Sequence, residues 1–235
     1  MLIKVCSLVG RNRPAVLLLS LALAAGLGLL RQSAADRDLV FVTGTVVILG
    51  AFVLALVALR GYHPVALRVR PEAPSFETLP AAGMTLLFAA FTVQGGTSVS
   101  GLLGGDLFDT VLIAVWATAL TLGWCLVFRA GGVRLTPDGV EDRQPFGSIV
   151  IPWEAFTGVP NPAYVTGRDK VSLMFSRAGL IRRRGWRPIG PALPAVSIDA
   201  RFLSYAVHEY AHRPEIRAAI GTETEYTRLV REFPG

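Results

Sequence analysis

The segment His208-Glu209-Tyr210-Ala211-His212 has residue types and spacing that match a catalytic motif. It has the form H-E-x-x-H, in which two histidines one helical turn apart bind a single zinc ion. The glutamate beside the first histidine then serves as general base toward the zinc-bound water. His208, Glu209 and His212 are therefore the candidate catalytic residues of a membrane-bound zinc hydrolase or protease.

Three features favour a solvated helix face over a zinc site. Pro214 follows the motif closely, so the helix must end there. On a helical wheel, both histidines lie with Ser204 opposite an apolar arc that would pack inward. Few residues remain downstream for a third ligand, for which Glu223 and Glu225 are the candidates. The leading expectation is therefore a non-enzymatic protein with no cofactor and no metal. The apolar arc consists of Phe202, Leu203, Ala206, Val207 and Tyr210.

A second group of residues could bind rather than react: Arg182, Arg183, Arg184, Trp186 and Arg187. Near an anionic bilayer surface each basic side chain contributes about 1 kcal/mol, so the cluster could bind lipid headgroups or a protein partner. A solvated turn on the cytoplasmic side is the alternative. The net charge of +6 is small, and the basic residues are interspersed with acidic ones. This composition does not indicate nucleic-acid binding.

The element that must carry these residues follows a long apolar region. Four stretches lack charged side chains: Pro14–Leu30, Leu39–Leu59, Thr78–Gly105 and Thr110–Phe128. About 20 apolar residues in a helix cross the hydrocarbon core. The mean hydropathy of +0.49 also suits a chain partly embedded in lipid. We expect four transmembrane helices, near 14–30, 39–59, 79–97 and 109–128, in a domain over residues 1–130. A soluble α+β domain is expected over 131–235.

The basic side chains near the expected spans predict their orientation, because Lys and Arg near span ends stay on the cytoplasmic side. The region after the third span, 95–105, has none. We therefore expect both termini to be cytoplasmic. The residues in question are Lys4, Arg11, Arg13, Arg60, Arg68, Arg70, Arg129 and Arg134. Arginine outnumbers lysine 21 to two, which we attribute to the base composition of a GC-rich bacterial genome, so the membrane expected is a bacterial inner membrane.

The first 35 residues also allow a cleavable signal peptide, ending in Ser33-Ala34-Ala35. Arg31 and Gln32 interrupt the approach to that cleavage site, and a second span follows at once. Cleavage would leave three spans with the C-terminal domain still inside.

The expected spans have no ionisable side chain near their middle, which argues against an ion-coupled transporter. An accessory subunit of a transport complex stays open. Small residues at Ala22, Gly26, Ala24, Gly28, Gly44 and Gly50 would let helices approach closely. The loop over 61–78 contains three prolines and is expected to be extended and irregular.

The C-terminal region changes to the period of strands. Val133–Thr136 alternates, Pro137-Asp138-Gly139 is a turn signal, and further strands are expected at 140–144, 148–153 and 171–175. Several short strands followed by a helix indicate a small α+β domain.

Two segments resemble the opening of the pleckstrin-homology-like domains of bacterial membrane proteins: Gly132–Val140 and Ile149–Glu154, which contains Ile-Pro-Trp. Phe202–Thr222 is similar to the tail of actinobacterial multi-pass membrane proteins. The resemblance implies a curved sheet capped by a C-terminal helix and implies no reaction. The Pro-rich stretch 188–194 departs from a compact version of that domain. The expected role is protein or membrane-surface interaction, with the lipid bilayer and a protein partner as the binding partners.

Overall fold

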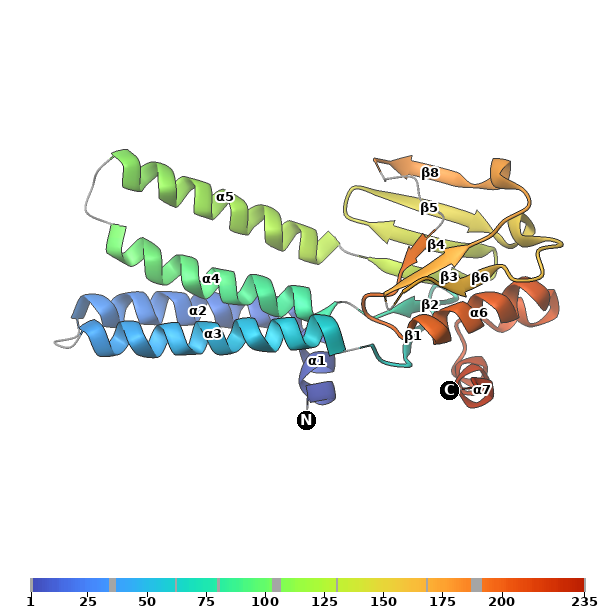
Figure 1. Cartoon of the computed structure of the whole chain (residues 1–235), viewed down its shortest axis with the longest axis horizontal. Helices are drawn as coiled ribbons and strands as arrows, with labels where there is room; N and C mark the ends of the chain where they lie inside the picture. Colours follow the sequence, from blue (N-terminus) through green and yellow to red (C-terminus); the bar gives the residue numbers. More distant parts are fainter. Residues whose placement is uncertain are drawn as a thin grey trace. The chain divides into compact units, whose positions relative to one another are not determined.

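The computed structural model describes residues 2–33, 37–61, 63–79, 81–102, 107–129, 131–167, 169–186 and 192–234. The chain divides into two compact units. The first combines Met1–Gly61 with Ala81–Phe128, and the second combines Tyr62–Pro80 with Arg129–Gly235. Both are drawn in Figure 1, where colour follows the sequence.

The first unit consists of helices: α1 (Leu2–Arg11), α2 (Arg13–Ser33), α3 (Arg37–Gly61), α4 (Ala82–Leu102) and α5 (Leu107–Arg129) (Figure 1). Among the described residues, three helices are long and apolar enough to cross a membrane, not the four expected. They are Arg13–Leu30, Val42–Gly61 and Asp109–Arg129, and the remaining stretch is the shorter apolar helix Ala82–Gly96.

Small residues set the closest helix contacts in the first unit. Gly96 of α4 lies against Ala24 of α2, and Gly123 of α5 lies against the ring of Phe88 on α4. A methyl group at either glycine would clash with its neighbour. Ala24 therefore lies at a close contact, as expected. Three of the glycines expected at such contacts have open space instead: Gly26, Gly44 and Gly50.

The second unit is built on two antiparallel sheets (Figure 1). The larger has the strand order β1-β2-β3-β4-β5-β8 and the smaller has β6-β7-β9. The larger sheet contains β1 (Leu67–Arg70), β2 (Ser75–Thr78), β3 (Gly132–Thr136), β4 (Gly139–Gln144), β5 (Gly147–Pro152) and β8 (Arg182–Gly185). The smaller contains β6 (Ala163–Val165), β7 (Lys170–Leu173) and β9 (Ala192–Pro194).

The strands expected at 133–136, 140–144, 148–153 and 171–175 are present as β3, β4, β5 and β7. The segment 61–78 was expected to be extended and irregular. It is extended, but the expected irregularity is wrong, because the segment contains the paired strands β1 and β2. Phe76 of β2 pairs with Leu135 of β3, so residues 62–80 belong to the second unit and not to a domain over 1–130. Strands β6, β8 and β9 were also not expected.

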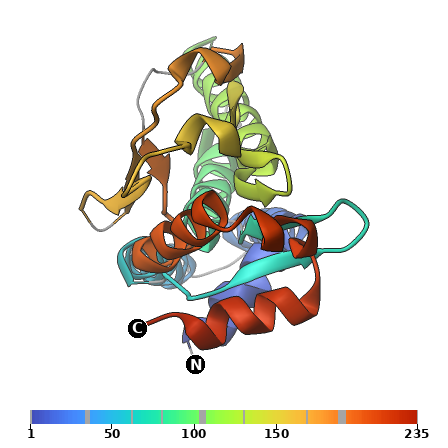
Figure 2. The same cartoon turned by 90° about the vertical axis from the view of Figure 1, so that its right-hand side faces the viewer.

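The helices of the second unit are α6 (Ala200–His212) and α7 (Glu223–Glu232), with short 3-10 turns at Trp153–Phe156, Ala178–Leu180 and Pro214–Ala219. Asp199 caps α6 by accepting hydrogen bonds from the N–H groups of Arg201 and Phe202. The helix ends before Pro214, as expected. Its apolar arc is buried, which confirms the predicted inward face. Helix α7 lies beside β1 (Figure 2).

Candidate functional site

The two histidines of the candidate zinc motif lie side by side on α6. Their ring centroids are 4.3 Å apart, and His212 Nδ1 is 2.9 Å from the carbonyl oxygen of His208. His212 is exposed, whereas His208 is half-buried. Burial, and then the neighbouring His212, lowers the pKa of His208. Ser204, expected on the same solvated side, instead donates a hydrogen bond to the carbonyl of Ala163 on β6.

Glu209 of the motif is engaged by arginines. Its Oε2 lies 3.1 Å from Arg213 Nη1 and 3.5 Å from Arg228 Nη1, and 13% of its side chain is exposed. A carboxylate held between two guanidinium groups is poorly placed to take a proton from a metal-bound water. Within the described part of the chain, no group of three or more His, Cys, Asp or Glu residues could hold a metal ion. The two arginine contacts of Glu209 disfavour the general-base role that the hydrolase alternative assigns to it.

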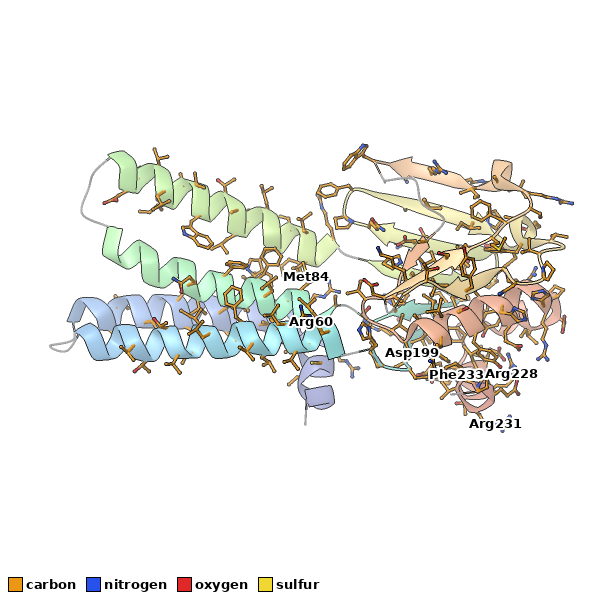
Figure 3. All side chains as sticks on the ribbon, viewed as in Figure 1. Arg60, Met84, Asp199, Arg228, Arg231 and Phe233 are labelled. Atoms are coloured by element: carbon orange, nitrogen blue, oxygen red, sulfur yellow. The ribbon has the colours of Figure 1, made fainter. Side chains whose placement is uncertain are left out.

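One of these two arginines, Arg228, lies at the centre of a charged cluster between α6 and α7. Arg228 binds the Glu225 carboxylate with two nitrogens, Nε to Oε2 at 2.9 Å and Nη2 to Oε1 at 2.7 Å. The hydroxyl of buried Tyr210 donates to Glu225 Oε1 at 3.0 Å. Burial, followed by the charge of Glu225, raises the pKa of Tyr210. Arg228 also binds Glu232 one turn further along α7. Figure 3 shows Arg228 on α7.

Sequence reasoning missed this cluster, although the spacing of Glu225, Arg228 and Glu232 is the helical pairing pattern of opposite charges. Tyr210 and Glu225 at its centre are buried, whereas Glu232 at its edge is exposed. The cluster attaches α7 to α6, and we regard its role as structural.

The arginine run of the candidate binding group lies on β8, an edge strand of the larger sheet. Arg182, Arg183 and Arg184 are all exposed. Among the residues that the structure describes, none of the three forms an ion pair. Trp186 follows them with 78% of its surface exposed. Arg187, also assigned to this group, lies outside the described residues.

The pairing of β8 with β5 sets where these side chains point. Ser148 pairs with Arg184, Ile149 with Arg183, and Val150 with Arg182. Successive side chains of a strand alternate between faces, so Arg182 and Arg184 share one face and Arg183 lies on the other. Charged side chains on an edge strand also prevent pairing with a second sheet, which is the structural explanation for the same run.

Sequence reasoning also missed Phe146, which lies in the turn between β4 and β5 with 62% of its surface exposed. Its carbonyl accepts a hydrogen bond from the N–H of Trp186 at 2.9 Å. The two strands approach closely here because Gly147 and Gly185 have no side chains. A Cβ at Gly147 would lie 2.6 Å from the carbonyl oxygen of Arg184, and Gly185 has a φ of +77°. The sequence did offer one signal for Phe146, because an aromatic residue directly after Pro145 is expected to lie in a turn.

No protein-family model, no curated protein and no solved structure matches the chain. The resemblance to bacterial pleckstrin-homology-like domains therefore stays an expectation.

Proposed function

We propose that the chain is a four-span membrane protein with both termini in the cytoplasm, whose second unit binds the anionic surface of a bilayer through β8. The observation that carries this proposal is the run of three exposed arginines on an edge strand, with Trp186 beside them. The proposal is non-enzymatic, and it concerns attachment and surface recognition.

The pairing of β2 with β3 supports four spans rather than three. Phe76 pairs with Leu135, and Glu77 pairs with Arg134, so residues on either side of α4 and α5 belong to one sheet. A sheet cannot be formed across a bilayer, since the ladder is a single hydrogen-bonded structure. The chain between Gly61 and Arg129 must therefore cross an even number of times. If α5 crosses the bilayer, α4 must cross it as well. The two crossings by α2 and α3 then place the N-terminus on the same side of the bilayer as the sheet.

Basic side chains near the helix ends support a cytoplasmic location for this sheet. Arg60 and Arg129 lie in the last turns of α3 and α5, and both are exposed. Arg68 and Arg70 follow on β1. Arginine near the ends of spans is retained on the cytoplasmic side.

The chemistry of β8 fits phosphate-bearing lipid headgroups. A guanidinium group presents a planar set of donors that binds phosphate oxygens with two hydrogen bonds, and it stays charged at all physiological pH values. Each such residue near an anionic surface contributes about 1 kcal/mol, and salt weakens the attraction. Three arginines together would therefore give a salt-sensitive attachment that depends on lipid charge.

Arginine footprinting of the full chain in lipid nanodiscs tests this proposal. Nanodiscs of phosphatidylcholine alone are compared with nanodiscs that also contain phosphatidylglycerol, and phenylglyoxal modification is followed by mass spectrometry. Anionic lipid should slow modification of Arg182, Arg183 and Arg184, and high salt should restore it. Two exposed arginines elsewhere, Arg201 and Arg231, are controls in the same sample. Equal rates in both lipids would overturn lipid binding by β8 and favour a protein partner.

A further inference from the structure

Phe146 and Trp186 both have exposed aromatic side chains, and a backbone hydrogen bond joins the two residues just beyond the ladder between β5 and β8. We call this pair the aromatic rim. The N–H of Trp186 is bonded to the carbonyl of Phe146, and the exposed fractions are 78% and 62% respectively. Large aromatic side chains are normally buried in a soluble domain, so an exposed pair indicates a surface that is covered by something else.

The register of the larger sheet shows at which end the rim lies. This end of the sheet contains the final residue pairs of the ladders that join β1 to β2, β3 to β4, β4 to β5, and β5 to β8. Beyond the last of them, the chain continues to Trp186, opposite Phe146. The pairs are Leu67 with Thr78, Gly132 with Arg143, Gln144 with Gly147, and Gly147 with Gly185.

The chain connects to the apolar helices at this same end of the sheet. The connections run from Gly61 to Leu67, from Thr78 to Ala82, and from Arg129 to Gly132. The shortest spans three Cα–Cα steps, which is about 11 Å when fully extended. If α5 ends at the bilayer surface, the first residue of β3 is within that distance of the surface. The end of the sheet that carries the aromatic rim is thus the end at which the chain joins the apolar helices, and it lies near the membrane if those helices cross one.

The side chains at this end suit the headgroup region of a bilayer. Tryptophan and other aromatic residues gather at the membrane–water interface, where one part of the ring is apolar and the indole N–H can reach water or headgroups. Arg183 and Arg184 are within three residues of Trp186 and can bind phosphate oxygens. An acidic protein would match these charges as well, but it would not explain exposed aromatic rings at the tethered end.

We propose that the aromatic rim inserts into the headgroup region of the same bilayer that the chain's own helices cross, and that Arg183 and Arg184 bind the phosphates of anionic phospholipids beside it. This inference rests on the proposed function for the membrane location of the helices. The partner is the chain's own membrane, and the rim fixes which end of the sheet faces it.

Quenching of tryptophan fluorescence by brominated lipid tests the rim in the full chain. The protein is placed in nanodiscs whose lipid is brominated near the headgroup or near the bilayer centre. The difference between the wild-type protein and Trp186→Phe isolates the signal of Trp186. Shallow bromine should quench this signal several times more strongly than deep bromine. Phe146→Ser should reduce the quenching, because it removes half of the rim.

A matched control moves the tryptophan to another exposed aromatic position. Tyr164 lies on β6 of the smaller sheet with 43% of its surface exposed. Trp186→Phe combined with Tyr164→Trp should give a tryptophan that brominated lipid hardly quenches. Equal quenching at both positions would overturn the rim as a specific anchor.

The outcomes separate this inference from the proposed function. Arginines protected by anionic lipid, with Trp186 unquenched, would overturn the rim and leave β8 binding intact. Trp186 quenched equally in charged and uncharged lipid, with the arginines unprotected, would support the rim and overturn charge-dependent binding by β8. Both effects together support both, and neither effect overturns both.

Discussion

Among single residues, Arg228 has the most ionic partners in the described part of the second unit, since it contacts Glu209, Glu225 and Glu232. Glu225 is 6% exposed, so removing its partner leaves a buried charge. We predict that Arg228→Met lowers the free energy of unfolding by about 3–5 kcal/mol. Urea unfolding of the detergent-solubilised chain, followed by near-ultraviolet circular dichroism, measures this change.

The control for this prediction is Arg231→Met, on the exposed side of the same helix. A surface substitution of this kind changes stability by no more than about 0.5 kcal/mol. If the two variants lose the same stability, the cluster does not hold α7 in place.

His208 makes the stability of the second unit depend on pH. Burial lowers its pKa in the folded protein below the usual value of 6.5. The unfolded chain therefore takes up a proton at a higher pH than the folded protein does, and stability is lost as the pH falls through that value. The melting temperature should fall between about pH 7.5 and about pH 5.

The variant His208→Gln should make part of this fall disappear, whereas Arg201→Gln should leave it unchanged. Differential scanning fluorimetry in matched buffers measures both. A wild-type fall that persists in full in His208→Gln would assign the pH dependence to other groups.

The environment of a single residue could be predicted from the sequence only where its partners lie nearby in the chain. The buried arc of α6 follows from the helical period alone, and it was predicted correctly. Ser204 was placed on the solvated side, but its hydroxyl reaches the carbonyl of Ala163 on β6. Glu209 was considered only as a general base, but Arg228 approaches it from α7. These partners lie 41 and 19 residues away in the chain, beyond any local pattern.

At the scale of elements, α6 packs through its apolar arc. Phe202 is fully buried, and its ring centroid is 5.2 Å from that of Phe233. Phe202→Ala should cost about 3–5 kcal/mol of stability. Ser204→Ala should cost only about 1 kcal/mol, because it removes one half-buried hydrogen bond. Similar shifts in urea midpoint for the two variants would contradict the assigned face.

The contact between α2 and α4 depends on Gly96, because a Cβ there would clash with Ala24. We expect Gly96→Ala to destabilise the first unit by about 1–3 kcal/mol. Gly26→Ala is the control on α2, since nothing lies within 4 Å of its Cβ position. A methyl group there should be neutral or stabilise by up to about 1 kcal/mol.

Reaction of the buried thiol of Cys6 with a fluorogenic maleimide during heating reports unfolding of this unit. Exposed Cys125 is first replaced by alanine, so that only one thiol responds. A lower melting temperature in Gly26→Ala than in Gly96→Ala would show that the close contact lies elsewhere.

Elements with a strong period were predicted from sequence, and elements without one were not. The apolar stretches became helices, and β3 alternates and is separated from β4 by a clear turn signal. β8 consists of three arginines and a glycine, so it has no apolar alternation, and only its ladder with β5 makes it a strand. β9 ends in Pro194, and its pairing with β7 likewise comes from tertiary structure.

At the scale of the whole molecule, the division at residue 130 was incomplete. Two helices, α4 and α5, are inserted between β2 and β3, which are neighbours in one sheet. Hydropathy locates the helices but cannot show that the short segment between α3 and α4 pairs with a strand that begins more than fifty residues later. Under the proposed function, that pairing requires an even number of spans between the two strands.

The even number of spans gives a prediction that cysteine labelling can check in cells. In a background with Cys6→Ala and Cys125→Ala, single cysteines are placed by Glu72→Cys, Thr224→Cys and Gly105→Cys. The first two substitute exposed residues of the second unit, and the third lies in the sequence between α4 and α5. A membrane-impermeant maleimide added to intact spheroplasts should label only Gly105→Cys if the proposed orientation holds, because that orientation places the sheet inside. The other two should react only after permeabilisation.

Labelling of Gly105→Cys only after permeabilisation, together with the other two, would show that α4 and α5 do not cross. Labelling of Glu72→Cys in intact spheroplasts would reverse the orientation of the whole protein.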